Sequence, residues 1–180
     1  QHFMEEEAPE DLSREDHAFL RLALEKAVEG LRRNMTPVGF SACSLEDNES
    51  RGTDANYRSV WARDGSIALI GALGLKDAAL TECARLTLTT LLDHVSPTGQ
   101  IPANVSIDTG HPDYSGVGGI CSLDSGLWVM IAFYEYIQAT EDLDFLRHYL
   151  PTLQRSMDWM SAHDSNNDAL LEIPEAGDWT

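Results

Sequence analysis

Three aspartates, Asp64, Asp124 and Asp178, stand at comparable places in the sequence, each where a helix is expected to begin. The two separations are similar, and each corresponds to about one helical hairpin with its loops. Every one of the three has a glycine nearby and a Trp or Arg within a few residues, in residues 61–65 (WARDG), 122–128 (SLDSGLW) and 177–179 (GDW). Sugar sites need this mixture, because carboxylates and arginine fix hydroxyl groups by hydrogen bonds and a Trp ring covers the apolar side of a pyranose.

Each aspartate also has a purely structural interpretation. Acidic residues are common in the first turn of a helix, where they complement the helix dipole and accept hydrogen bonds from free N–H groups. For any one of the three, capping is the more common explanation. Their repetition at matching places favours a shared site, provided that the helices begin at the same end of the molecule.

Helical periodicity divides the chain into helices of two alternating kinds. Amphipathic helices are predicted over residues 13–31, after a capping-box pattern at residues 13–16 (SRED), and over residues 77–91. Between and after them, residues 61–75 and 123–140 are apolar nearly all round. A last amphipathic stretch over 143–160 is predicted as two helices, with Pro151 as the first residue of the second. Residues 34–58 and 95–121 are predicted long loops, and no period-2 pattern predicts a strand.

A helix that is apolar on every face must be covered on every side. Alternation of covered and covering helices is what two concentric layers of helices require, whereas a plain antiparallel bundle would make every helix amphipathic. The predicted fold is therefore all-α, an α/α barrel in which the inner helices start at one end. The three aspartates would then converge on one mouth, with the long loops forming its rim.

The charge balance of the chain limits the classes of partner that it can bind. The chain has 30 Asp+Glu against 12 Lys+Arg, a formal net charge of -18, which disfavours nucleic acid and membranes as partners. Its three cysteines, Cys43, Cys83 and Cys121, form no CxxC motif and are interpreted as structural thiols in a reducing compartment. The acidic N-terminal residues do not resemble a secretory signal, so a cytoplasmic location is expected.

Residues 164–175 (DSNNDALLEIPE) place acidic and amide side chains at four positions of an EF-hand-like loop, namely Asp164, Asn166, Asp168 and Glu175. However, Ala169 occupies the position where the tight turn needs glycine. A polar loop after a helix is the preferred interpretation, with calcium binding left as the alternative. No metal or other cofactor is expected.

Several segments carry a family resemblance. Residues 57–65 (YRSVWARDG) resemble the sugar-gripping segment of glucoamylases and related toroid glycosidases, whose Arg-Asp pair holds the 4- and 6-hydroxyls of a terminal glucose. The order of residues 61–64 (WARD), 99–104 (GQIPAN) and 123–128 (LDSGLW) is similar to neutral/alkaline invertases and to the bacterial and archaeal amylo-α-1,6-glucosidase (glycogen-debranching-like) group. Residues 175–180 (EAGDWT) resemble the general-acid segment of these enzymes and of trehalases. The likeness runs from about residue 56 to the end.

The resemblance implies roles for the matching residues. Arg63 and Asp64 would bind the terminal sugar, with Trp61 stacked nearby. Gln100 and Asn104 would line the rim of the site. Asp124 would form a hydrogen bond with a sugar hydroxyl.

The same resemblance implies that Asp178 is the general acid. Trp179 and Glu175 would raise its pKa by desolvation and like charge. Because glucoamylases use a glutamate in a slightly different alignment, Glu172 and Glu175 remain alternatives.

The family mechanism is inverting, with acid and base ~6.5–9.5 Å apart to seat a water. Its base comes from the second half of the barrel, so residues 1–180 are expected to be the N-terminal half of one (α/α)6 catalytic domain, with the rest of that barrel as partner. The expected activity is exo-acting release of glucose from an α-linked glucan or oligosaccharide. Two alternatives stay open: a sucrose-hydrolysing invertase-like enzyme, and a non-catalytic helical sugar-binding module or scaffold.

Overall fold

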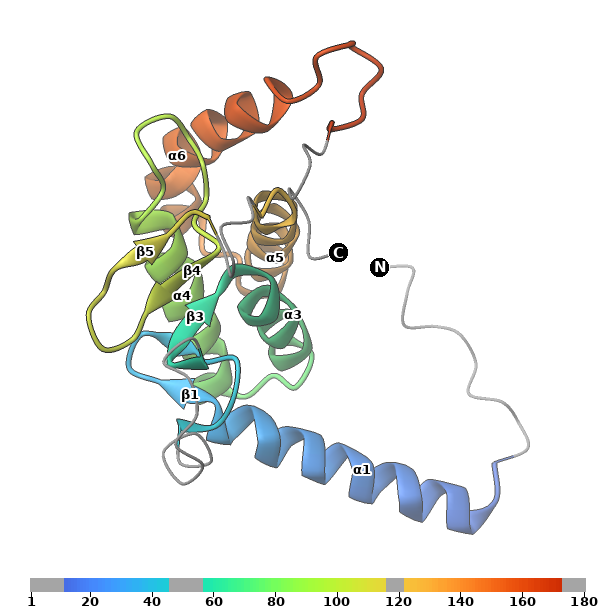
Figure 1. The fold of residues 1–180 in the computed structure, drawn as a ribbon. Coiled ribbons are helices and arrows are strands. Elements are labelled where there is room, and N and C mark those ends of the chain that lie inside the picture. Colours follow the sequence, from blue (N-terminus) through green and yellow to red (C-terminus); the bar gives the residue numbers. More distant parts are fainter. Residues whose placement is uncertain (1–11, 46–56, 116–121, 173–180) are drawn as a thin grey trace.

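The computed structural model of the protein describes residues 12–45, 57–115 and 122–172, and these residues are mostly helical (Figure 1). They form five helices: α1 (Arg14–Arg33), α3 (Ala62–Leu73), α4 (Ala78–Asp93), α5 (Asp124–Thr140) and α6 (Leu143–Ser161). The predicted predominance of helix is therefore confirmed. Among the described residues, no helix combines the length and the apolar character needed to cross a membrane.

The described residues also include short strands, which no period-2 pattern predicts. A short hairpin joins β1 (Met35–Thr36) to β2 (Gly39–Phe40), inside the first predicted loop. A three-stranded antiparallel sheet has the order β3 (Ser59–Trp61), β4 (Asn104–Ser106) and β5 (Pro112–Asp113). Strands of two or three residues are too short to show a period-2 pattern, so only their pairing across the fold reveals them.

The helix starts follow their local capping signals. Ser13 Oγ accepts a hydrogen bond from Asp16 N at 3.1 Å, and Ser13 N donates one to Asp16 Oδ2 at 2.9 Å, which completes the predicted capping box. Asp77 Oδ1 accepts from the backbone N of Ala79 at 2.9 Å and Leu80 at 3.0 Å, and so begins α4. These contacts satisfy N–H groups that have no partner within the helix.

The predicted division at Pro151 is wrong, because α6 is one continuous helix with Pro151 inside it. A proline in a helix interior lacks the N–H that would bond four residues back, at a substantial cost. Buried side chains lie along the same helix on both sides of the proline, namely Phe145, Tyr149, Leu153 and Met160. This shared packed face holds the two parts as one element.

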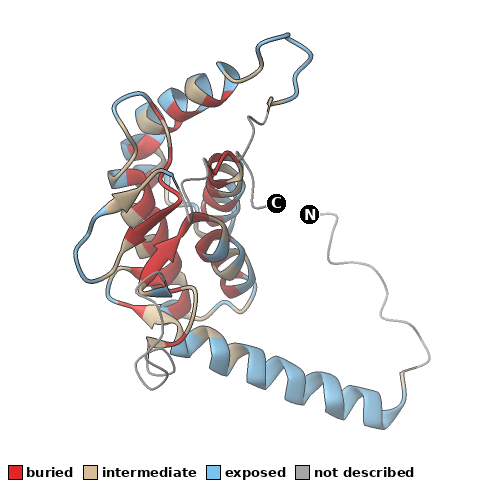
Figure 2. Ribbon diagram, viewed as in Figure 1, coloured by how far each residue is buried: buried red, intermediate tan, exposed pale blue. Residues whose placement is uncertain are grey.

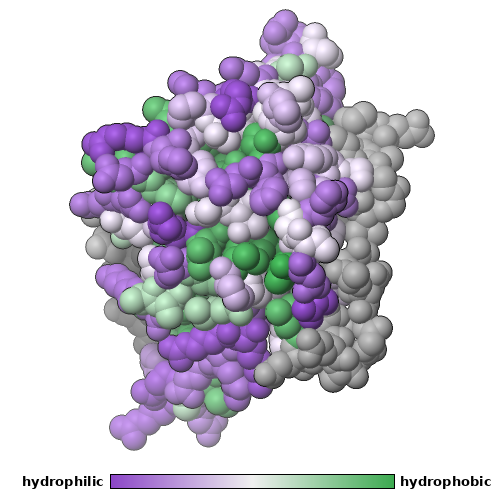
Figure 3. Space-filling view, turned by 90° about the vertical axis from the view of Figure 1, so that its left-hand side faces the viewer, coloured by the Kyte–Doolittle hydropathy of each residue, from purple (hydrophilic) through white to green (hydrophobic). Residues whose placement is uncertain are grey.

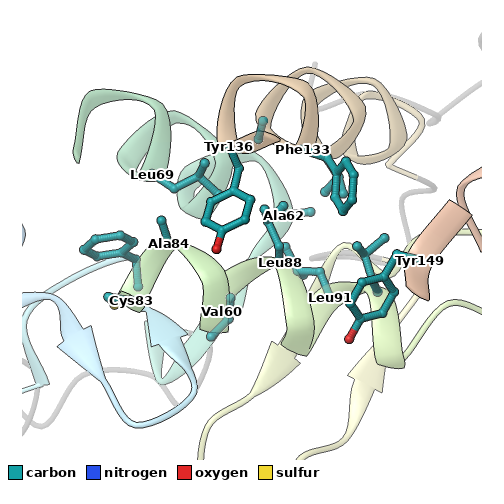
Figure 4. Close-up of a cluster of buried hydrophobic side chains, with 14 of the residues drawn as sticks. Val60, Ala62, Leu69, Cys83, Ala84, Leu88, Leu91, Phe133, Tyr136 and Tyr149 are labelled. Carbon is teal, nitrogen blue, oxygen red and sulfur yellow. The ribbon is translucent and has the colours of Figure 1, made fainter. Parts of the chain in front are cut away.

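The core lies where α3 packs against both α4 and α5, with β3 and β4 at one side (Figures 1 and 4). Leu69 of α3, Leu88 and Leu91 of α4, and Val60 of β3 are fully buried. Aromatic rings join α5 to α6, with the Phe133 and Phe145 centroids 5.5 Å apart. Four helices and the sheet thus share one hydrophobic cluster.

The prediction that the apolar helices are covered on all sides does not hold within the described residues. About half of the surface of Ile67 on α3 and of Leu127 and Ile131 on α5 is exposed, and Tyr134 is 61% exposed. The opposite side of the molecule, which carries the β4–β5 hairpin, is mostly hydrophilic around a small hydrophobic area (Figure 3). α3 and α5 therefore expose apolar side chains although their other faces pack in the core, and α6 does so as well at Leu143, Leu150 and Met157.

The first helix also differs from expectation. Although α1 is amphipathic, none of its residues is buried, and it extends away from the rest of the molecule (Figures 1 and 2). At least half of the surface of Phe19, Leu20 and Leu24 is exposed. Apart from Leu31 near its C-terminal end, which is partly buried and packs against the core, its apolar stripe is therefore not part of the core described above.

Thr87 is the point at which β2, α3 and α4 meet. Its fully buried hydroxyl accepts a hydrogen bond from Phe40 N at 2.9 Å and donates one to Cys83 O at 2.8 Å. A Cβ added at Gly65 would lie 2.9 Å from Thr87 Cγ2, closer than real side chains approach. Gly65 therefore lets the first turn of α3, and the residues before it, pack directly on α4.

Replacing Thr87 with Val tests this junction. The change keeps the shape but leaves the buried Phe40 N–H without its acceptor, so we expect the free energy of unfolding to fall by about 1–3 kcal/mol. Chemical denaturation followed by circular dichroism measures the change. Thr81→Val is the matched control in the same helix, because the Thr81 hydroxyl bonds only the Asp77 carbonyl and is partly exposed. Equal losses in the two variants would contradict a special role for Thr87.

Candidate functional site

The first turns of α3 and α5 are joined by an ion pair. Arg63 Nη1 donates to Asp124 Oδ2 at 2.9 Å, and both side chains are about one-third exposed. Asp124 is the first residue of α5 and Arg63 the second of α3. The two helices therefore begin side by side at the same end, and each brings one of the predicted site residues to that end.

Asp124 is held from its own side by serines. Buried Ser122 donates a hydrogen bond from Oγ to Asp124 Oδ1, and the same Oγ lies 2.7 Å from Ser125 Oγ. The N-cap residue of α5, Leu123, provides no side-chain cap. Both carboxylate oxygens of Asp124 thus have side-chain partners, one from Arg63 and one from Ser122. Sequence reasoning missed Ser122, although a serine two residues before an aspartate at a helix start is a recognisable signal.

Asp64 follows Arg63 in the first turn of α3 but is exposed. No hydrogen bond or ion pair links its carboxylate to another described residue. The two adjacent residues therefore differ: Arg63 is fixed by a partner on α5, and Asp64 presents an acceptor that is not already engaged. A charged acceptor next to a fixed guanidinium suits a polar neutral ligand.

Strand pairing brings Trp61 and Asn104 together. The two residues are direct partners in the β3–β4 register, and the next backbone N, of Ala62, donates to Ala103 O at 2.9 Å. Trp61, which is 7% exposed, is also the N-cap residue of α3. The sheet thus fixes Trp61 and Asn104 close to the start of α3, where Arg63 and Asp64 lie.

Asn104 and Gln100 occupy different environments. Gln100 lies in the loop before β4, where its Nε2 donates to Tyr114 O at 3.1 Å and its backbone N donates to Ser96 Oγ at 2.9 Å. Asn104 is only 8% exposed as a whole residue, and no hydrogen bond joins its side-chain amide to another described residue. The amide atoms are not fully enclosed, because the buried unpartnered side-chain atoms of the described residues belong to Ser66, Thr89 and Ser156. The Asn104 amide therefore keeps donor and acceptor capacity for a ligand.

The expected general-acid segment lies near the end of the chain. Its residues Asp178, Trp179 and Glu175 lie outside the described residues. Glu172 is described, and its carboxylate accepts a hydrogen bond from Ser165 N while its own N donates to His163 O at 2.9 Å. One role of Glu172 is therefore to close the loop that follows α6.

In the loop that follows α6, a carboxylate accepts hydrogen bonds from the loop's own backbone. Asp164 accepts from Asp168 N at 3.1 Å and from Ala169 N at 3.0 Å. Ala169 has φ of 67°, the left-handed conformation that glycine usually supplies. Among the described residues no group of three His, Cys, Asp or Glu side chains could hold a metal ion. Glu175, the fourth position of the EF-hand-like pattern, is not among them.

Of the described thiols, that of Cys83 is unsuited to nucleophilic chemistry. Cys83 is only 2% exposed. Burial raises the pKa of Cys83 to about 11, so this thiol is protonated at neutral pH and is not a nucleophile. Cys83 is a core residue, in agreement with its predicted structural role, while Cys121 lies outside the described residues.

A double-mutant cycle tests the ion pair at the helix starts. We expect Arg63→Gln and Asp124→Asn to show a favourable coupling of about 1 kcal/mol in the free energy of unfolding, because the pair is partly buried. The matched control is the exposed Arg147–Asp144 pair on α6, whose coupling should be within error of zero. A coupling near zero for Arg63 and Asp124 would show that the pair does not join the two helices.

Comparison with known proteins identifies the family to which the chain belongs. A family model described as amylo-alpha-1,6-glucosidase matches residues 52–166, which include the segments of Arg63, Asn104 and Asp124. None of the curated proteins compared with the chain matches it. The family match covers more than half of the chain and names a glycoside-hydrolysing class. The chain therefore belongs to the amylo-alpha-1,6-glucosidase family, a glycogen-debranching-like group of proteins.

Proposed function

We propose that the protein is an inverting, exo-acting glycoside hydrolase that releases glucose from an α-linked glucan or oligosaccharide without a cofactor. The observation that carries the proposal is the Arg63–Asp124 ion pair beside the unengaged carboxylate of Asp64, within the segment that matches the family. The family match supports glycoside hydrolysis in general. The sugar released and the stereochemistry are the parts that experiment must test.

The proposed sugar grip follows from the chemistry of these side chains. Asp64 accepts hydrogen bonds from sugar hydroxyls, and Arg63 donates to them from a guanidinium whose orientation Asp124 fixes. Trp61 is 7% exposed, and we propose that the accessible part of its ring meets the apolar face of a pyranose. Asn104 in β4 and Gln100 in the loop before β4 extend this polar lining. Rigid placement of such groups on helix starts and paired strands is what selective binding of a neutral sugar requires.

In the proposed reaction Asp178 gives its proton to the glycosidic oxygen as the bond to the anomeric carbon breaks. A water attacks that carbon from the opposite face and passes its proton to a base, so the configuration is inverted. Trp179 and Glu175 are proposed to keep Asp178 protonated by desolvation and like charge. The base is proposed to come from the rest of the barrel, ~6.5–9.5 Å away.

We further propose that residues 1–180 form the N-terminal half of one (α/α)6 catalytic domain. Two observations support this arrangement. Helices α3 and α5 begin at the same end, as inner helices of a toroid would. Their apolar side chains Ile67, Leu127 and Ile131 are about half exposed, which a further layer of helices from the rest of the barrel would correct.

A substrate panel tests the proposed activity on the whole protein. We expect glucose release from panose or maltotriose, measured with an enzymatic glucose assay, and release of the β-anomer from an α-linked substrate, measured by NMR. Cleavage of sucrose in preference to both would favour an invertase-like enzyme. Absence of cleavage of all three would remove the substrate assignment and leave the sugar-binding module.

Replacing the proposed acid tests the mechanism. Asp178→Asn should lower kcat by about 10²–10⁴-fold, because the amide cannot protonate the leaving oxygen, while glucose binding measured by calorimetry is retained. Asp158→Asn, a change of the same kind at an exposed position of α6, is the control and should leave kcat unchanged. If Glu172→Gln or Glu175→Gln abolishes turnover and Asp178→Asn does not, the acid is a glutamate.

A further inference from the structure

The three-stranded sheet places a third side chain in line with Trp61 and Asn104. In the β4–β5 register Asn104 is the direct partner of Asp113, just as it is the partner of Trp61 in the β3–β4 register. Directly opposite residues of antiparallel strands project from the same face of a sheet. Trp61, Asn104 and Asp113 therefore form one row across the three strands.

The two faces of this sheet differ in chemistry. Val60 and Val105, which are also direct partners, point to the other face and belong to the hydrophobic core. The row of Trp61, Asn104 and Asp113 is thus on the opposite face, where Trp61 and Asn104 are 7% and 8% exposed and Asp113 is half-buried. An aromatic ring, an amide and a carboxylate side by side are the groups that bind the apolar face and the hydroxyls of a sugar.

The carboxylate of Asp113 is oriented but only half used. Its Oδ1 accepts hydrogen bonds from Ser115 N at 2.9 Å and Ser115 Oγ at 2.8 Å. Its Oδ2 has no hydrogen bond to any described residue. The backbone is fixed as well, because Asp113 O accepts from Ala103 N at 2.7 Å. Asp113 is half-buried, so one carboxylate oxygen remains available in a defined position.

Asn104 adds a second side chain with unused hydrogen-bonding capacity at this place. The residue is 8% exposed, and its amide makes no hydrogen bond within the described part of the chain. The side chains of direct partners begin about 4.5–5.5 Å apart, yet the Asn104 amide and the Asp113 carboxylate do not bond to each other. Both are left with unused capacity on the same face.

We propose that Asp113 is a further substrate-binding residue, which accepts a hydrogen bond from a hydroxyl group of a glucosyl unit while Asn104 bonds a neighbouring hydroxyl. The inference rests on the proposed glycosidase function and adds a residue to its site. Ser115 acts as a positioning residue that fixes the carboxylate of Asp113.

Asp113→Asn tests the inference in the whole protein. The amide keeps an oxygen for Ser115 but loses the charge, so we expect kcat/KM for maltotriose to fall about 10-fold or more. For one maltotriose analogue that lacks a single hydroxyl, the variant and the wild type should have equal kcat/KM, because the lost contact is already absent. Asp108→Asn is the matched control in the same hairpin: Asp108 pairs with Arg58, and its replacement should not change kcat/KM.

The outcomes separate the inference from the function on which it rests. An active wild-type protein whose kcat/KM is unchanged by Asp113→Asn would overturn the inference alone. A uniform loss with every deoxy analogue, accompanied by a lower melting temperature, would show that Asp113 only supports the hairpin and would also overturn it. A wild-type protein that neither binds nor cleaves any glucan would overturn the proposed function and the inference together.

Discussion

The contact between Arg63 and Asp124 determines where a site can form in this protein. It joins the first turn of α3 to the first turn of α5 and so fixes both helices to begin at one end. The strand before α3 and the loop before α5 must then arrive at the same place. The tight packing of Gly65 against Thr87 sets the distance of α3 from α4 and adds β2 to the same end of the core.

Local sequence signals were sufficient for the helices and insufficient for the strands. Capping residues such as Ser13 and Asp77 act within one turn, so their effect is visible in the sequence alone. Pairing of β3 with β4 joins residues more than 40 positions apart, and no local pattern encodes it. Pro151 was misleading for a related reason, because the buried face of α6 outweighs the local preference of proline for a first helical turn.

The candidate site shows the same division. Residue types at expected helix starts identified Arg63, Asp64 and Asp124 as a group, since helix starts are local features. The contact of Ser122 with Asp124 is also local, whereas the position of Asp113 depends on strand register, which the sequence does not reveal. The sequence also does not predict how many sides of α3 and α5 are buried. Their burial depends on which other helices pack around them.

We propose that Asp64, Asp124 and Asp178 face one sugar-binding pocket. A crystal structure of the whole protein with bound glucose or a glucose-derived inhibitor tests this arrangement most directly. We expect the sugar within hydrogen-bond distance of Arg63 and Asp64, with the carboxylate of Asp178 directed at the anomeric oxygen. A sugar bound elsewhere, or a carboxylate of Asp178 on the opposite side of the molecule from Asp124, would contradict it.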